Sequence, residues 1–310
     1  MILLLILKRF SLKSINLFKK ASAQSARENA LIFLANFANS TDLITVCKNC
    51  IEEKHLFNPR ESIKCKLLKF YANFDIHNFH LMQVFTESQI VFEDNHLLII
   101  NKKVGQLVQG DKTGDESLLD SIKNFIKKRD NKPGNVFLGL VHRIDRPTSG
   151  LVIYAKTSKA LSRLTQMVKN REIKKTYWAI VAKEMIPQSQ RLVHYLQKNE
   201  KNNKAIVFIK PTENAKEAIL TYNIIKVLDN YQLLEIDLET GRHHQIRAQL
   251  SKTGVPIKGD LKYGSPRSNP DGGISLHARK LELIHPVTKE KMKIIAKVPE
   301  NDKVWKACEE

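Results

Sequence analysis

Two short apolar runs, 136–141 and 151–155, lie on either side of a polar loop in which one acidic residue stands between two arginines. A run that is apolar at nearly every position predicts a strand buried on both faces, because neither side of such a strand suits water. Pro147 and Gly150 punctuate the loop and predict a shaped turn instead of a third strand. A polar loop held between buried strands is a common way of presenting functional side chains.

The pattern on either side of this loop predicts both strands and helices. Strand signals occur at 89–92, 97–100, 176–182, 191–196, 204–209, 218–227 and 231–238. Apolar residues recur at helical spacing over 118–126, 158–170 and 243–252. Asp115 precedes the first of these helices as a plausible cap. We therefore expect an α+β fold, with a mixed, largely antiparallel central sheet and flanking helices.

The character of the chain changes near Met82. Residues 1–81 contain no recognisable motif and no clear alternation of apolar residues, so we expect an N-terminal extension of unknown role over 1–81 and one main domain over 82–310. Met1 and Met82 are both candidates for the residue at which translation of the natural protein begins. Cys47 and Cys50, with Cys65 and His55, would suit a small zinc site, but a single CxxC without a second pair favours ordinary thiols.

Charge favours nucleic acid as the partner. The 51 Lys and Arg residues outnumber the 32 Asp and Glu residues and give a formal net charge of +19, which attracts polyanions. Lysine makes up most of this excess, and lysine is also a common solvated surface residue. The charge alone is therefore compatible with both readings.

Cysteine usage and hydropathy bear on the compartment. Four unevenly spaced cysteines do not form a disulfide framework, which favours a reducing compartment, and we expect the cytoplasm. The apolar run 1–7 ends at Lys8 and is far shorter than the roughly 20 residues that span a bilayer. We expect no membrane association.

The loop itself reads HRIDRPTSG over 142–150. Arg143 and Arg146 flank Asp145, so neighbouring positive charge would keep this carboxylate ionised and available as a nucleophile. The same guanidinium groups are suited to phosphates. On composition alone, a surface ion pair beside a turn is the more common explanation of these residues.

The loop, followed directly by LVIYAKT, closely resembles the signature loop of the RluA family of pseudouridine synthases. Further segments resemble the family in its own order, namely NKKVGQLV at 101–108, KKTYWAIV at 174–181, TGRHHQIRAQL at 240–250, GDLKYG at 259–264 and LHARKLELIHP at 276–286. The resemblance covers about residues 86–300. Lys103 stands where the family usually has proline and Gln249 where it usually has a second histidine, which concerns loop shape and helix packing.

The resemblance implies the pseudouridine synthase fold with a catalytic cleft, and the isomerisation of specific uridines in structured RNA, either rRNA or tRNA. It implies that Asp145 is the catalytic residue, that Arg247 pairs with it and that Tyr177 lies against the target uracil, where a flat ring can stack. Arg143 resembles the residue that fills the gap left by a flipped base. We expect the other RNA or substrate contacts from His142, Arg146, Lys102 and Arg242.

The helical pattern is consistent with the place given to Arg247. Ile246 and Leu250 lie four residues apart and would anchor one face of the helix in the core. Arg247 would then lie on an adjacent face, from which it can reach a cleft. A surface arginine on an amphipathic helix is the alternative without the resemblance.

The implied reaction needs few groups. The bond from ribose to N1 of uracil breaks, the base turns and it rejoins through C5, without net oxidation, so we expect no cofactor and no metal. A nucleophilic carboxylate must attack either the sugar or the base, and a dry pocket must retain the detached uracil. Tyr177 is a candidate for moving the C5 proton. RNA is the expected partner, and we expect a monomer without an obligate protein partner.

Three alternatives stay open on the sequence. A glycoside hydrolase would need a second carboxylate, for which Asp260 is the nearest candidate, although a loop hydrogen bond suits it better. A metal hydrolase would have to use the histidines His243, His244, His277 and His285. A non-catalytic RNA-binding protein that keeps the fold is the third.

Overall fold

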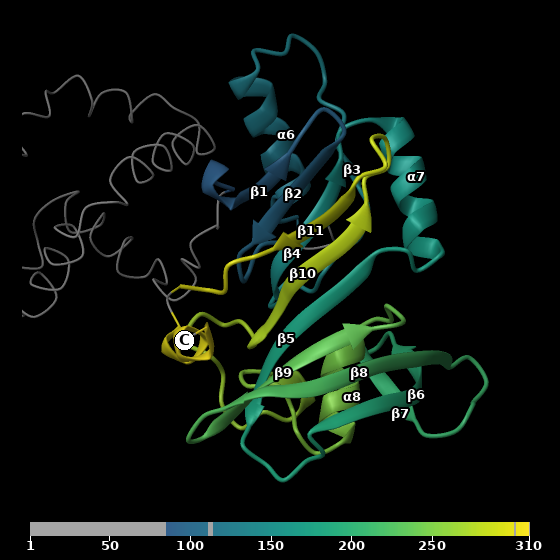
Figure 1. Ribbon diagram of the computed structural model, residues 1–310, viewed down its shortest axis with the longest axis vertical. Helices are drawn as coiled ribbons and strands as arrows, with labels where there is room; N and C mark the ends of the chain where they lie inside the picture. The colour runs from purple at the N-terminus through teal and green to yellow at the C-terminus, as the bar shows by residue number, and fades with distance from the viewer. Residues whose placement is uncertain (1–84, 111–113, 301, 310) are drawn as a thin grey trace, which may run out of the picture. The chain divides into compact units, whose positions relative to one another are not determined.

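The computed structural model describes residues 85–110, 114–300 and 302–309, which build one eleven-stranded sheet with flanking helices (Figure 1). The expectations for residues 1–81, including the zinc alternative at Cys47 and Cys50, lie outside the described residues. Within the described part of the chain, no helix is long and apolar enough to cross a bilayer.

The strands are β1 (Ile90–Glu93), β2 (Leu97–Lys102), β3 (Gly139–Leu140), β4 (Ser149–Ala155), β5 (Lys174–Ala182), β6 (Ser189–Asn199), β7 (Lys204–Phe208), β8 (Lys216–Val227), β9 (Tyr231–Leu238), β10 (Leu276–Ile284) and β11 (Lys291–Ile295). The α-helices are α6 (Leu118–Arg129), α7 (Ser158–Lys169), α8 (Gln245–Lys252) and α9 (Lys303–Glu309). Two 3-10 turns, η1 (Glu87–Gln89) and η2 (Leu261–Tyr263), complete the set. The predicted α+β class is confirmed.

The strand order is β1-β2-β4-β10-β5-β9-β8-β6-β7, with β11 paired to β10 and β3 paired to β4. Every pairing is antiparallel except that of β4 with β10, where Gly150 lies opposite Ala278. Gly150 has a φ of +111°, and a Cβ added there would lie 2.4 Å from the backbone of Ala278. Glycine is therefore required where the polar loop joins β4. The sheet is mixed and largely antiparallel, as predicted.

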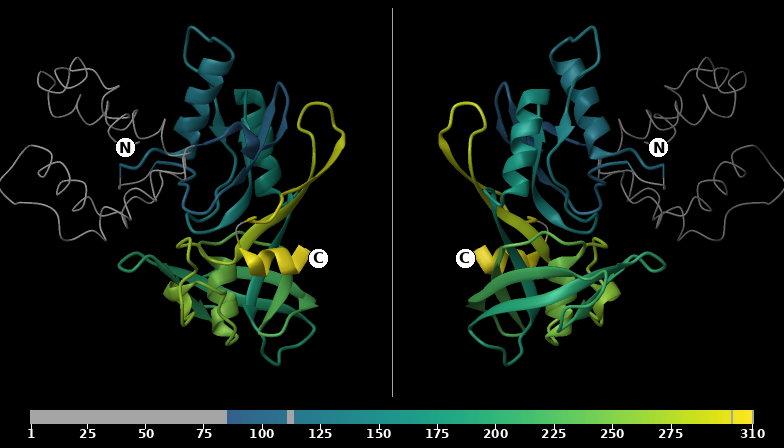
Figure 2. Two further views of the ribbon diagram at one scale, coloured as in Figure 1. Left: turned by 90° about the vertical axis from the view of Figure 1, so that its left-hand side faces the viewer. Right: turned by 90° about the vertical axis from the view of Figure 1, so that its right-hand side faces the viewer.

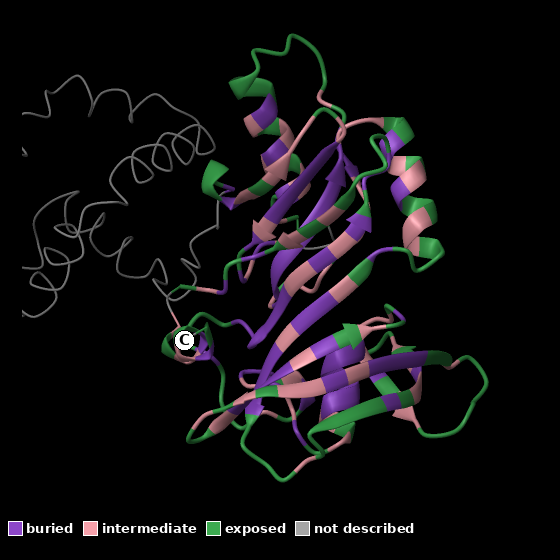
Figure 3. Ribbon diagram, viewed as in Figure 1, coloured by how far each residue is buried: buried purple, intermediate pink, exposed green. Residues whose placement is uncertain are grey.

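Helices α6 and α7 cover opposite faces of β2 and β4. Leu98 and Ile100 share a buried cluster with α6, whereas Leu97 and Ile99 share another with α7. Successive residues of a strand point to opposite faces, so both faces of β2 are buried and the strand reads as a continuous apolar run. Figure 3 shows β4 buried along its length, and β4 behaves in the same way.

The other end of the sheet packs on α8 and α9. Ile246 and Leu250 of α8 join a buried cluster with Ala179 of β5. On the opposite face of β5, Ile180 packs with Trp305 of α9. Figure 2 shows α8 at the end of the sheet away from α6 and α7. Helices α6 and α7 thus cover the two faces of the sheet at β2 and β4, and α8 and α9 cover its two faces at β5.

Three local expectations are corrected. Of the buried strand expected at 136–141, only Gly139–Leu140 forms a strand, β3, and Phe137 is 48% exposed. The cap of α6 is Ser117, whose hydroxyl accepts from the Asp120 amide, whereas Asp115 pairs with Arg146 at 2.8 Å. Helix α8 begins at Gln245, two residues later than predicted, because His244 adopts a left-handed conformation with a φ of 51°. That conformation turns the chain sharply between β9 and α8.

Candidate active site

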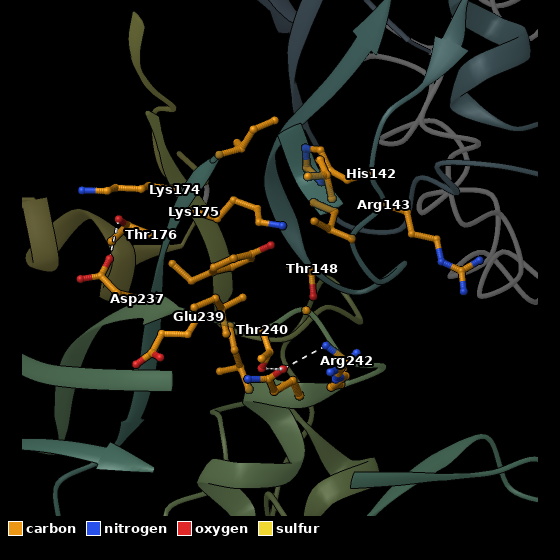
Figure 4. Close-up of a pocket in the computed structure, with 18 of the residues that line it drawn as sticks. His142, Arg143, Thr148, Lys174, Lys175, Thr176, Asp237, Glu239, Thr240 and Arg242 are labelled. Carbon is orange, nitrogen blue, oxygen red and sulfur yellow. Dashed lines mark hydrogen bonds between the residues drawn. The ribbon is translucent and has the colours of Figure 1, made fainter. Parts of the chain in front are cut away.

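A cleft of about 990 Å³ opens between the polar loop, the start of β5 and the turn that leads into α8 (Figure 4). This volume is at the upper end of the range for small-molecule sites, which is roughly 300–1,000 Å³. Eight Lys or Arg residues and four acidic residues line it. The excess of positive charge favours an anionic ligand over a neutral one.

Asp145 is presented at this cleft by the loop between β3 and β4. Its side chain is 28% exposed, and Arg247 Nη1 donates to its Oδ2 at 3.0 Å. The turn is closed by the Thr148 amide, which donates to the Asp145 carbonyl at 3.0 Å. The structure therefore brings together, across 102 positions of the chain, the two residues that the resemblance paired.

Arg247 is in turn held by Asp260, which lies at the start of η2. Arg247 Nε donates to Asp260 Oδ2 at 2.7 Å, and Nη2 donates to Oδ1 at 2.9 Å. Burial works to lower the pKa of Arg247, but the hydrogen bonds and charge of Asp260, together with Asp145, raise it above its usual value. The guanidinium thus stays charged and fixed in one plane. The expected loop hydrogen bond of Asp260 is replaced by a buried bidentate ion pair.

His244 is a second neighbour of Asp145. Its Nε2 lies 3.6 Å from Asp145 Oδ2, and its Nδ1 lies 2.9 Å from the hydroxyl of Tyr263. Burial lowers the pKa of His244 to about 3, against the opposing charge of Asp145, so the ring is neutral. The Tyr263 hydroxyl accepts from the Ala205 amide at 2.7 Å. Its own proton is therefore free for His244 Nδ1, which places the imidazole proton on Nε2, toward Asp145.

Tyr177 lies on β5 beside the same carboxylate. It is 8% exposed, and burial, followed by the nearby charge of Asp145, raises the pKa of Tyr177 above its usual range. The phenol is therefore protonated at neutral pH. A protonated phenol suits stacking and hydrogen-bond donation better than it suits removal of a proton.

Lys102 does not line the cleft, and the expectation of an RNA contact is wrong. It is fully buried at the end of β2. Its ammonium donates to the carbonyls of Lys103 at 3.0 Å, Arg146 at 3.0 Å and Thr148 at 2.7 Å. Burial lowers the pKa of Lys102 to about 7, partly offset by the charge of Asp145. Lys102 thus holds the chain on the C-terminal side of Asp145 from within the core.

The remaining candidates from the loop have different surroundings. His142 lines the cleft, and its Nε2 accepts from the Ile153 amide at 3.3 Å. Burial, followed by the charge of Lys175, lowers the pKa of His142 to about 3, so it is neutral. Arg143 is exposed and lines the cleft, and Figure 4 shows its guanidinium pointing away from the other labelled side chains. Arg146 is exposed but lies outside the lining, where it binds Asp115.

Arg242 lines the cleft at the turn before α8. Its Nε donates to the Glu217 carbonyl at 2.8 Å, which anchors the side chain along β8. Sequence reasoning gave no role to Lys175, a half-buried lysine of the cleft wall, or to Tyr263. Tyr263 could have been found from its place in the segment GDLKYG, which also contains Asp260. Lys175 could have been found because it lies two positions from Tyr177 on one strand, so that both side chains point to the same face.

The geometry does not support the hydrolase alternatives. His243 and His244 stack on each other, His277 contacts Ser149 and His285 contacts Asp94, so the four histidines do not converge. Across residues 85–110, 114–300 and 302–309, no three His, Cys, Asp or Glu side chains are grouped to hold a metal ion. Asp260 is 1% exposed and neutralised by Arg247, so it is not available as the second carboxylate of a glycosidase.

Comparison with known proteins gives one consistent result. The family pattern described as RNA pseudouridylate synthase matches residues 96–252. An uncharacterised RNA pseudouridine synthase of Synechocystis is 34% identical over 68% of this chain and 65% of its own length. The ribosomal large subunit pseudouridine synthase C of Vibrio parahaemolyticus is 33% identical over 68% of this chain and 65% of its own length. The chain therefore spans about 65% of the length of these relatives.

Among solved structures, the human protein RNA pseudouridylate synthase domain containing 4 superposes with a TM-score of 0.58. It is 24% identical, and the match covers 69% of this chain and 89% of that one. At this identity the likeness concerns the fold alone. The family pattern and the two bacterial relatives carry the assignment further: the chain belongs to the RluA family of RNA pseudouridine synthases.

Proposed function

We propose that this chain isomerises uridine to pseudouridine in RNA, with Asp145 as the catalytic carboxylate. The observation that carries the proposal is the setting of Asp145, which is partly exposed at a positively charged cleft while Arg247 holds it from the buried side. A nucleophilic step on a polyanion needs an ionised carboxylate in a fixed orientation. Family membership supports the same reaction.

The chemistry balances without a cofactor. The bond between ribose C1′ and N1 of uracil breaks, the base turns, and a bond forms between C1′ and C5. C5 loses one proton and N1 gains one, so composition and oxidation state do not change. Asp145 forms a transient bond to C1′ or to the base; both routes begin from the ionised carboxylate. Arg247 orients that carboxylate, and neutral His244 directs an N–H toward it without adding a second full charge.

The target base must leave its stack before Asp145 can reach it. We propose that Tyr177 stacks on the flipped uracil, as a buried, protonated ring at the cleft wall is suited to do. Arg143 is exposed at the rim and would occupy the gap in the RNA. Arg146 and Arg242 would contact the backbone around it.

Structured RNA, either rRNA or tRNA, is the proposed substrate. The names of several relatives refer to the large ribosomal subunit, which makes large-subunit rRNA the first candidate to test. We propose that the protein acts as a monomer in the cytoplasm.

The deciding experiment maps pseudouridine in total RNA from cells that carry or lack this gene, and then restores the gene with variants. Wild-type protein should restore at least one pseudouridine, and Asp145→Asn should restore none while its affinity for RNA persists. Asp229→Asn, which changes an exposed carboxylate between β8 and β9, is the matched control and should behave as wild type. An unchanged pseudouridine map without the gene would favour a non-catalytic RNA-binding protein instead.

A further inference from the structure

Lys175 is a half-buried lysine in the cleft wall, and its ammonium has no hydrogen-bond or ion-pair partner among the described residues. Lys175 and Thr148 both line the cleft, and in the view of Figure 4 the side chain of Lys175 extends from β5 in the direction of Thr148. Burial lowers the pKa of Lys175, which means that the folded protein bears a cost for the charged form. An anion bound at the amine would offset this cost.

The acidic residues of the same wall do not neutralise Lys175. Asp237 accepts from the Thr176 hydroxyl at 2.7 Å, and Glu239 is paired with Arg191 at 2.8 Å. Glu282 lies 4.0 Å from Lys280. The charge of Lys175 is instead directed at the cleft, where it acts on His142 across from β5.

The position of Lys175 relative to Tyr177 indicates which anion it meets. The two residues are separated by one position on β5, so their side chains point to the same face and their Cα atoms lie roughly 7 Å apart. If Tyr177 and Asp145 mark the place of the flipped uracil, the amine of Lys175 lies beyond the base, within reach of the sugar-phosphate of the same nucleotide. A compact ammonium suits a phosphate as a point charge.

We propose that Lys175 binds a phosphodiester group that flanks the flipped uridine. This inference rests on the proposed function for the place of the base, but it concerns a separate contact. Lys175 gives the cleft a fixed anion subsite, so that the strand enters with its backbone against β5 and its base toward Asp145.

The test measures binding of a nine-nucleotide oligouridylate, in which any base can serve, to the full chain carrying Asp145→Asn so that no product forms. In this background, Lys175→Met should reduce the slope of log affinity against log salt by about 0.7, the value for one phosphate contact on a single strand. Lys175→Arg should restore the slope. Lys127→Met, an exposed lysine of α6 outside the cleft, should leave it unchanged.

Competition by single nucleotides then locates the phosphate. Uridine 5′-monophosphate or uridine 3′-monophosphate should displace the oligonucleotide better than uridine does, and Lys175→Met should remove this advantage. An unchanged salt slope, a loss of affinity for uridine as large as that for the nucleotides, or equal competition by all three would overturn the inference. None of these results depends on pseudouridine formation, so they are distinct from a failure of the proposed reaction.

Discussion

Asp260 holds Arg247 by two parallel hydrogen bonds, of 2.7 Å and 2.9 Å, and leaves one nitrogen of the guanidinium to bind Asp145 at 3.0 Å. The arginine therefore connects a buried carboxylate to a partly exposed one. The planar fork of arginine allows this, because its five N–H groups point in fixed directions. The orientation of Asp145 is thus set by a residue 115 positions away in the chain, which does not itself reach the cleft.

Asp260→Asn should slow the reaction at saturating RNA with little change in RNA affinity. The amide turns one acceptor into a donor that faces the guanidinium, so Arg247 loses its fixed plane, and a rate loss of at least about tenfold corresponds to roughly 1.4 kcal/mol. The buried charge left on Arg247 should also lower the free energy of unfolding by about 3 kcal/mol. Single-turnover rates, binding isotherms and urea denaturation measure the three effects.

The matched control is Asp130→Asn, which removes an exposed carboxylate paired with Arg129 at 2.8 Å. An exposed pair contributes little to stability, so this variant should stay within about 1 kcal/mol of wild type. A rate for Asp260→Asn equal to that of this control would contradict the role given to Asp260.

Lys102→Met should loosen the loop that carries Asp145. Methionine has a similar length but no donors, so the Thr148 carbonyl loses its partner inside the core, at about 1–3 kcal/mol for this unsatisfied group, while the Arg146 carbonyl keeps only the Gly105 amide. Hydrogen exchange at the Thr148 amide should become faster and the reaction slower. Lys103→Met, at the exposed neighbouring position, should change neither. Exchange that stays as slow as in wild type would show that the loop does not depend on Lys102.

Gly150→Ala should destabilise the fold severely. The added methyl group would meet the backbone of Ala278 at 2.4 Å, and the φ of +111° is strained for any residue with a Cβ. A loss of about 3 kcal/mol or more in the free energy of unfolding is expected from overpacking with backbone strain. Gly110→Ala, where no atom lies within 4 Å of the added carbon, is the control and should unfold as wild type. Equal denaturation midpoints for the two variants would refute this account of the pairing between β4 and β10.

Stability should fall steeply below about pH 6.5. Burial is the main cause that lowers the pKa of His142, His244 and His277 to about 3 each. In the unfolded chain the pKa of a histidine is about 6.5. Between these values the unfolded state binds more protons than the folded state, so the free energy of unfolding rises with pH in this window and is lost as pH falls.

Each fully shifted histidine contributes a slope of about 1.4 kcal/mol per pH unit to that dependence. Urea denaturation of wild type and of His277→Asn between pH 6.5 and pH 4 measures it. The variant should show a smaller slope, whatever its absolute stability. Identical slopes would mean that His277 is protonated in the folded protein.

Most of the strands and helices as far as α8 were predictable because their signals are local, whereas the apolar pattern did not predict β10, β11 or α9. Both faces of β2 are covered, so its continuous apolar run identified a buried strand, and α7 ends within one residue of the prediction. The start of α8 was missed, because a left-handed residue before a helix leaves no mark in the spacing of apolar side chains. The cap of α6 was misassigned because Asp115 is taken by Arg146, a partner from another part of the chain.

The candidate site was predictable only where several of its residues share one short segment. Asp145 and Arg247 were named in advance because each lies in a distinctive motif. Lys102 was placed wrongly because lysine is usually exposed, and nothing next to it in sequence reveals the three carbonyls that accept its hydrogen bonds. Asp260 was assigned a local hydrogen bond because nothing next to it in sequence reveals that Arg247 is its partner.

The sequence by itself determined the class of fold and most of its strands and helices as far as α8, and its resemblance to the RluA family singled out Asp145. The strands and helices follow from local periodicity, and the resemblance rests on residues that stand together in one loop. The tertiary structure alone decided which charged groups are buried and which face the cleft, because burial and pairing depend on chain segments that meet only after folding. Asp260 acquires its partner at that stage, and His244 and Lys102 acquire both their partners and their shifted pKa values. Lys175 is left without a partner among the described residues at the same stage.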